Sequence, residues 1–102
     1  MEQAFVEKED ILELPVRDNV RAIQTLIEEL EAINSYYQKY NATSKTTEVS
    51  KNLAKILKHN MDDEMEHVGM LLEHLRLQFP ELDVQLRKFL FGGELSDKEI
   101  EE

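Results

Sequence analysis

The chain has 102 residues, the length of a single domain (1–102), and its 22 acidic and 12 basic residues give a formal net charge of −10. This acidity argues against nucleic acid and anionic membrane surfaces as partners. The absence of cysteine excludes disulfides, zinc fingers, iron–sulfur clusters and cysteine nucleophiles. The N-terminus lacks a signal-peptide core and no apolar run approaches the ~20 residues that span a bilayer. We therefore expect a protein of the cytoplasm, or of a compartment loaded from it.

Residues 1–14 have weak periodicity and are predicted to form an N-terminal arm that orders only against a partner. A helix is predicted from about Asp18 to Tyr40, with either Asp18 as its N-cap or Pro15 in its first turn. The polar residues 41–47 that follow predict a short turn. The helix has a wide apolar face that consists of Val20, Ile23, Leu26, Ile27, Leu30, Ile33, Tyr37 and Tyr40.

A second long helix is predicted after this turn, with Thr46 or Thr47 as its N-cap. It ends near Phe79, because Pro80 prevents simple continuation. Its residues at helical spacing form an apolar stripe, made of Leu53, Leu57, Met61, Val68, Leu71, Leu75 and Phe79.

A short third helix is predicted over residues 81–91, ended by Gly92 and Gly93, with residues 92–102 as a mobile tail. The predicted fold class is therefore all-α, an antiparallel hairpin of two long helices plus a short C-terminal helix. A hairpin of this size leaves one side of each apolar stripe facing water. We therefore expect two copies to pair as a homodimer with a four-helix arrangement.

Glu64 and His67 lie three residues apart in the middle of the apolar stripe, so their side chains share one face. A carboxylate there is costly unless a cation neutralises it. Glu-x-x-His on a helix is the recurring unit of di-metal carboxylate bundles, which add a Glu from each of two further helices. Glu29 borders the apolar face of the first helix and offers that carboxylate. We predict that two copies share a pair of divalent ions on these residues, and the mixed ligands favour iron, manganese or zinc over calcium.

Other candidate residues have less specific surroundings. Glu28 and Glu31 are interpreted as a solvated face, although three acids in one turn also draw cations inward. Tyr36, two turns after the first-helix ligand, either hydrogen-bonds a ligand carboxylate or packs in the core, and packing is favoured. His59 and His74 have no matching partner spacing and are predicted to be structural or exposed.

Four stretches of the chain carry a family resemblance, and they are Ile27–Ile33 (IEELEAI) with Tyr36, His59–His67 (HNMDDEMEH), Met70–Glu73 (MLLE) and Arg87–Phe91 (RKFLF). In these stretches the chain resembles the encapsulated ferritins, the ferritin-like cargo proteins of bacterial and archaeal encapsulin shells. The resemblance covers roughly residues 14–91 and implies a ferritin-like arrangement of each dimer. It implies a di-iron ferroxidase centre on Glu29, Glu64 and His67 of two chains, which oxidises Fe(II) with dioxygen. It also implies an outer acidic site for entering iron on Glu28 and Glu31.

The family further implies a decameric ring of five dimers inside an encapsulin shell, which holds the mineral that the ring cannot store alone. The expected function is therefore that of a ferroxidase for iron storage.

The chain departs from the family's pattern at two places. Ser35 occupies the place where the family usually has Trp, and residues 94–102 contain no recognisable cargo-loading peptide, so either the chain is shortened or loading works otherwise.

Two other functions are compatible with the same residues. One is a non-catalytic helical assembly module with a structural metal, such as zinc, at the dimer interface. The other is a di-metal oxygenase or peroxidase-type reductase, which would need an organic substrate pocket that the sequence does not indicate.

Overall fold

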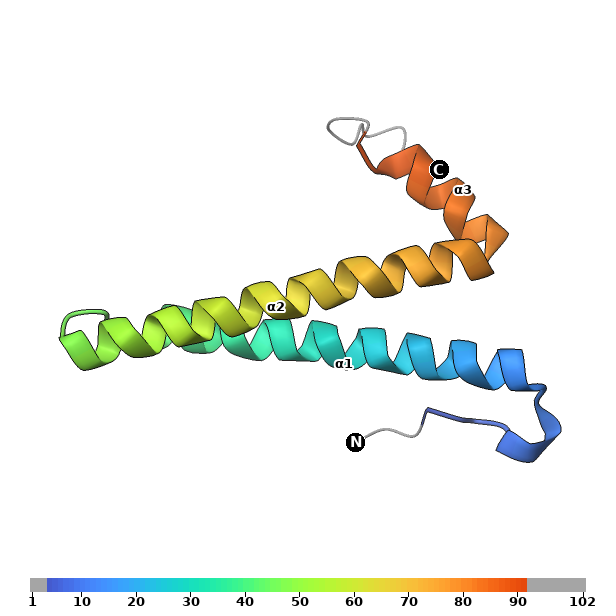
Figure 1. Cartoon of the computed structure of the whole chain (residues 1–102), viewed down its shortest axis with the longest axis horizontal. Helices are drawn as coiled ribbons and strands as arrows, with labels where there is room; N and C mark the ends of the chain where they lie inside the picture. Colours follow the sequence, from blue (N-terminus) through green and yellow to red (C-terminus); the bar gives the residue numbers. More distant parts are fainter. Residues whose placement is uncertain (1–3, 92–102) are drawn as a thin grey trace.

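The computed structural model describes residues 4–91. In chain order it contains a short 3-10 helix η1 (Glu9–Ile11), two long helices α1 (Leu14–Ala42) and α2 (Glu48–Gln78), and a short helix α3 (Pro80–Phe89). The long helices run antiparallel, and α3 bends away from them at the open end (Figure 1). The described residues contain no strand, so the predicted all-α class is confirmed. The predicted tail at 92–102 lies outside the described residues.

Helix α1 begins at Leu14, four residues before the predicted cap. Pro15 occupies its first turn, where the missing backbone N–H would have had no intrahelical partner. Asp18 lies inside the helix and accepts a hydrogen bond from Nη1 of Arg21 at 3.3 Å. The Pro15 start is therefore confirmed, and the assignment of Asp18 as N-cap is wrong.

The described part of the N-terminal arm packs against its own helix. Nη2 of Arg21 lies 3.1 Å from Oε2 of Glu9, and the Arg21 guanidinium lies 5.7 Å from the centroid of the Phe5 ring. Nε of Arg17 donates to the carbonyl of Leu12 at 2.8 Å. The described part of the arm therefore contacts two arginines of α1 in the same chain, and its ordering against a partner stays a prediction.

Helix α2 begins with a capping box at Thr47. Oγ1 of Thr47 accepts from the backbone N–H of Ser50 at 3.1 Å, and Oγ of Ser50 accepts from the N–H of Thr47 at 3.0 Å. Of the two predicted caps, the structure therefore selects Thr47 over Thr46. The helix ends at Gln78, one residue before the predicted end and two before Pro80.

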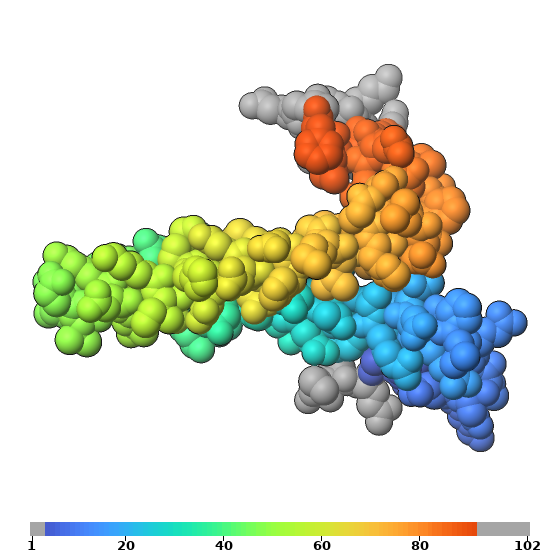
Figure 2. Space-filling view, in the orientation of Figure 1, coloured from blue at the N-terminus to red at the C-terminus, as the bar shows by residue number. Residues whose placement is uncertain are grey.

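Helix α3 is shorter than predicted and begins one residue earlier. It starts at Pro80 and ends at Phe89, before the glycine pair expected to terminate it, and that pair lies outside the described residues. Phe91 has a φ of 63°, the left-handed conformation that usually falls to glycine after a helix. The helix stands off the hairpin and leaves a concave side between α2 and α3 (Figure 2), where a pocket of about 410 Å³ lies.

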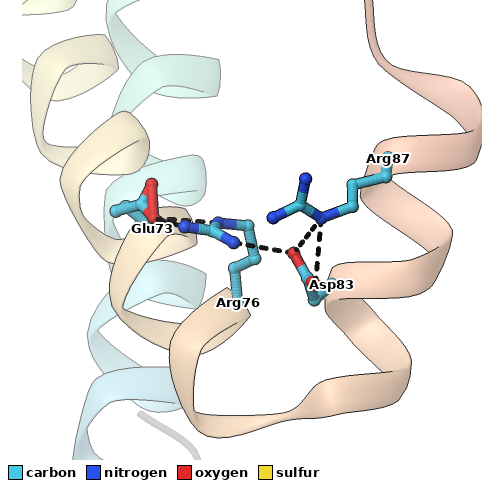
Figure 3. A network of polar contacts seen from close by, with 4 residues as sticks. All are labelled: Glu73, Arg76, Asp83 and Arg87. Carbon is cyan, nitrogen blue, oxygen red and sulfur yellow. Dashed lines mark hydrogen bonds and ion pairs between the residues drawn. The ribbon is translucent and has the colours of Figure 1, made fainter.

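Four charged side chains join α3 to α2 (Figure 3). Oδ1 of Asp83 accepts from Nη1 of Arg76 at 2.7 Å and from Nε of Arg87 at 3.0 Å, while Arg76 also donates to Glu73. Hydrogen bonds from Arg76 and Arg87 lower the pKa of Asp83. The hydrogen bonds to Glu73 and Asp83 raise the pKa of Arg76. Because Arg76 and Asp83 lie on either side of the Pro80 break, this network links α3 to α2 across the break.

The core of the described chain is small. Its buried hydrophobic residues are Ala54, Leu57, Met61 and Leu75, all on α2. Leu53 and Phe79 of the predicted stripe are instead 48% and 39% exposed, because a single neighbouring helix covers only one side of α2. The helices therefore carry more apolar surface than one chain can bury.

Much of this uncovered surface forms one row on each long helix, which we call the outer apolar rows. The residues of each row recur at spacings of three and four or their sums, so each row lies along one helix face. On α2 the row is interrupted between Ile56 and Met70, where the same face carries Asn60, Asp63 and His67. Exposed apolar faces on both long helices mark an interaction surface. The rows consist of Val16, Ile23, Ile27, Leu30 and Tyr37 on α1, and of Val49, Leu53, Ile56, Met70 and Leu77 on α2.

Candidate metal centre

Three side chains with metal-binding atoms converge at the middle of the hairpin. Glu29 lies near the midpoint of α1, and Glu64 and His67 lie near the midpoint of α2. One potential ligand atom from each residue lies within 4.8 Å of the other two. Nδ1 of His67 is 3.4 Å from Oε2 of Glu29 and 3.6 Å from Oε2 of Glu64. The structure therefore brings together the three residues proposed as ligands from sequence.

Local and tertiary structure each supply part of this geometry. The three-residue spacing places Glu64 and His67 one turn apart on the same face of α2. Glu29 comes from the side of α1 that faces α2, and its side chain is only 19% exposed. The Glu64 side chain is 23% exposed and the His67 side chain 49%, so the group is half-covered by the hairpin and open on the imidazole side.

The donor set suits a transition metal. Two carboxylates so close together repel each other unless a cation lies between them. Carboxylate and imidazole ligands together bind iron, manganese and zinc. Three protein donors are fewer than the four that fill a closed structural zinc site.

A surface pocket of about 410 Å³ adjoins the group and is lined by Thr25, Glu29, His67, Met70 and Leu71. Met70 belongs to the outer apolar row of α2 and is 64% exposed. His67 lies three residues before Met70 and so on the same side of the helix. The open side of the group therefore faces the surface on which we expect a second copy to pack.

The other sequence candidates lie outside this group. Glu28 and Glu31 are exposed and do not contribute to it. Ser35 is also exposed. Tyr36 is half-buried, and its ring lies 5.8 Å from the Lys39 ammonium. Within the described residues Tyr36 makes no hydrogen bond to a ligand carboxylate.

The two remaining histidines make polar contacts away from the group. Nε2 of His59 lies 3.3 Å from Oδ2 of Asp63, and its side chain is 75% exposed. Nε2 of His74 lies 3.3 Å from Oδ1 of Asn19, a contact between α1 and α2 that the sequence did not indicate. Both histidines are exposed, as predicted.

The chain matches a family model described as EncFtn-like over residues 4–93. It is 46% identical over 86 residues to a "Ferritin-like protein" of Thermotoga maritima, covering 84% of this chain and 68% of the relative. It is 41% identical over 71 residues to an "Encapsulated ferritin-like protein" of Rhodospirillum rubrum, covering 70% of this chain and 47% of the relative. The chain thus spans about half the length of the second relative.

A crystal structure of a protein from Nitrosomonas europaea has the same fold, with a TM-score of 0.81. It is 40% identical in sequence, and the alignment covers 91% of this chain and 98% of the other.

No helix among the described residues is long and apolar enough to cross a membrane.

Proposed function

The chain belongs to the EncFtn-like family, and on this premise we propose that it is a ferroxidase, which oxidises Fe(II) to Fe(III) with dioxygen at a di-iron site between two subunits. The names of the Thermotoga and Rhodospirillum relatives support an iron-related, ferritin-like function. The observation that carries the finer proposal is the convergence of Glu29, Glu64 and His67 within 4.8 Å.

One chain supplies half of the proposed site. Two copies related by a two-fold axis would bring four carboxylates and two imidazoles together, the ligand set of di-iron carboxylate bundles. Two Fe(II) ions carry four positive charges and balance the four carboxylates. The outer apolar rows offer the surface for this pairing, because the row on α2 passes beside His67.

The substrates of the reaction are Fe(II) and dioxygen. Two Fe(II) ions give one electron each, and one dioxygen takes both electrons and two protons to become hydrogen peroxide. The Fe(III) ions then leave as precursors of the oxide. The protein holds the two irons close together, with carboxylates that favour the higher charge of Fe(III) and an open side through which substrates enter.

Residues around the centre have subsidiary roles in this proposal. Glu28 and Glu31 are exposed on α1 beside Glu29, and we assign them to an outer site that attracts entering Fe(II). Exposed carboxylates raise the local concentration of cations before they reach the half-covered ligands. Tyr36 is assigned to packing beside the centre, consistent with its half-buried position.

We further propose that the dimers form a decameric ring of five and work inside an encapsulin shell in the cytoplasm. The family match and the name of the Rhodospirillum relative support this placement. The oxidised iron would accumulate in the shell, since an open hairpin dimer encloses no volume in which a mineral could grow.

The proposal is tested by aerobic Fe(II) oxidation, followed by the absorbance of the Fe(III) product. We expect Glu29→Ala to reduce the rate to that of buffer, because it removes one of three donors from each half-site. Glu66→Ala is the matched control, since it removes an exposed carboxylate of α2 that lies outside the group. Rapid oxidation by Glu29→Ala, with dimerisation unchanged, would contradict the proposed site.

The alternative is a non-catalytic assembly module, which the exposed outer apolar rows favour as much as they favour a ferroxidase dimer. A module with a structural metal would bind Fe(II) without oxygen and then oxidise it no faster than buffer after admission of air. Anaerobic titration followed by exposure to air therefore separates the two functions.

A further inference from the structure

The end of the hairpin where α1 joins α2 carries a charge opposite to that of the whole chain. Between Tyr37 and Asp63 lie five basic residues, all lysines, and two acidic residues. This region, which we call the basic tip, therefore has a formal net charge of +3 in a chain of net charge −10. A local reversal of sign marks a surface that attracts anions.

A surface pocket of about 460 Å³ lies in the basic tip. Tyr40 of α1 and the buried Ala54 of α2 form its less polar part. The rest of its lining is dominated by cations and consists of Lys45, Lys51, Lys55, Lys58, His59 and Asp62.

Two of the four lysines have structural roles. Nζ of Lys45 donates to the carbonyls of Tyr40 at 2.6 Å and Thr43 at 3.0 Å, and so satisfies backbone acceptors at the end of α1. Nζ of Lys58 lies 2.6 and 2.8 Å from the two carboxylate oxygens of Asp62. The charge of Lys58 is therefore balanced within the pocket.

Lys51 and Lys55 carry positive charge that the fold does not balance closely. The carboxylate of Glu48 lies 3.9 Å from Nζ of Lys51, and its side chain is 87% exposed. Lys55 forms no ion pair within the described residues. Lys51, Lys55 and Lys58 are four and three residues apart, so three like charges lie on one face of α2 and repel one another. Lys51 also lies near the N-terminus of α2, the positive end of the helix dipole. Both effects destabilise α2, and local conflicts of this kind are expected at functional sites.

We propose that this pocket binds a phosphate-class oxyanion, held by the ammonium groups of Lys51 and Lys55 with Tyr40 as one wall. Each ammonium offers up to three hydrogen-bond donors and binds phosphate as a compact charge. An anion between the two lysines replaces their repulsion with two attractions. Inorganic phosphate and phosphate monoesters share this chemistry.

The pocket is separate from the proposed metal centre and from the proposed pairing surface. Asp62, at the pocket, precedes Glu64 by two residues, so their side chains leave α2 about 200° apart. Lys51 and Lys55 likewise lie on a different side of α2 from Leu53 in the outer apolar row. Pairing of two copies through that row would therefore leave the pocket open to solvent.

The test is isothermal titration calorimetry of the metal-free full chain with inorganic phosphate and, separately, with glycerol 3-phosphate. Sodium chloride at equal ionic strength measures the non-specific effect of salt. We expect saturable binding of at least one phosphate compound, weakened about tenfold by Lys55→Gln, because a charge-assisted hydrogen bond is lost. Lys39→Gln is the matched control, since it removes the same charge near the same end of the hairpin from a residue outside the pocket lining.

Tighter binding of glycerol 3-phosphate than of inorganic phosphate would support the site and identify a monoester as its ligand, and the reverse order would support it with free phosphate as ligand. Equal weakening by Lys39→Gln and Lys55→Gln would overturn the proposal, because only diffuse charge would then be at work. Heats no larger than those of sodium chloride would also overturn it. Binding of poly-glutamate without binding of phosphate would reassign the surface to an acidic protein segment. Far-UV circular dichroism of each variant verifies that the helices remain folded.

Discussion

Nδ1 of His67 lies 3.4 Å from Oε2 of Glu29, a contact between residues 38 positions apart that joins the middle of α1 to the middle of α2. The register of the hairpin therefore sets the geometry of the candidate centre. A slip of one helical turn would move Glu29 by about 5.4 Å along α1. Thr25 or Ile33, four residues to either side, would then face His67 in its place, and neither has a carboxylate.

The first prediction concerns metal affinity. We expect His67→Ala to weaken binding of Co(II) by at least about tenfold, because it removes the one nitrogen donor from a three-donor group. Titration followed by the visible absorption of Co(II) measures this change. His74→Ala, which removes a histidine from the same helix outside the group, should leave the affinity unchanged. Equal losses in both variants would argue against ligation by His67.

The second prediction concerns pairing of two copies through the outer apolar rows. Ile27 is 40% exposed in one chain, and we expect Ile27→Glu to abolish the dimer, because an unpaired carboxylate at an apolar interface costs about 3 kcal/mol or more. Size-exclusion chromatography with light scattering gives the molar mass. Ser35→Glu introduces the same charge at an exposed position outside the row and should remain dimeric. A dimeric Ile27→Glu variant would place the interface elsewhere.

The third prediction concerns the capping box at the start of α2. Thr47→Ala removes the side-chain acceptor of the Ser50 N–H and should destabilise the fold by about 1 kcal/mol. In a domain of this size, that loss lowers Tm by roughly 4–8 °C. Thr46→Ala is the control, because the hydroxyl of Thr46 contacts only Ser44 Oγ among the described residues, so its Tm should change little. A smaller effect for Thr47→Ala than for Thr46→Ala would contradict the cap.

The fourth prediction concerns the response of α3 to acid. Hydrogen bonds from Arg76 and Arg87 lower the pKa of Asp83 in the folded state, so its stabilising effect is fully present above its unfolded pKa of about 3.9. That effect is lost as the pH falls through the lower folded value. As the pH falls from the unfolded pKa of Asp83 through its folded pKa, we expect amide hydrogen exchange of α3 to accelerate. The exchange rates are corrected for their intrinsic dependence on pH. Asp83→Asn should exchange faster at neutral pH and lose the acid response, whereas Glu81→Gln should retain it.

Local patterns in the sequence were sufficient for most of the secondary structure. Helical periodicity, the Pro80 break and the polar turn correctly placed two long helices and a short third one. Thr47 was among the predicted caps, and only the geometry of its hydrogen bonds with Ser50 distinguished it from Thr46. These features depend on neighbours within about four residues, which is the range of a helical hydrogen bond. Asp18 was misassigned because a good capping residue stood inside a helix that a proline had already begun.

The face that each side chain occupies also follows from the sequence, and this made Glu64 and His67 recognisable as a pair. Glu28 and Glu31 belong to the same turn of α1 as Glu29. The packing of α1 against α2 along their whole length therefore decides which of these carboxylates approaches His67. Likewise, the wide apolar faces indicated burial, but the packed hairpin determines which residues remain uncovered as the outer apolar rows. Periodicity reports direction around one helix, whereas register and burial depend on contacts between residues far apart in the chain, which exist only once the hairpin has closed.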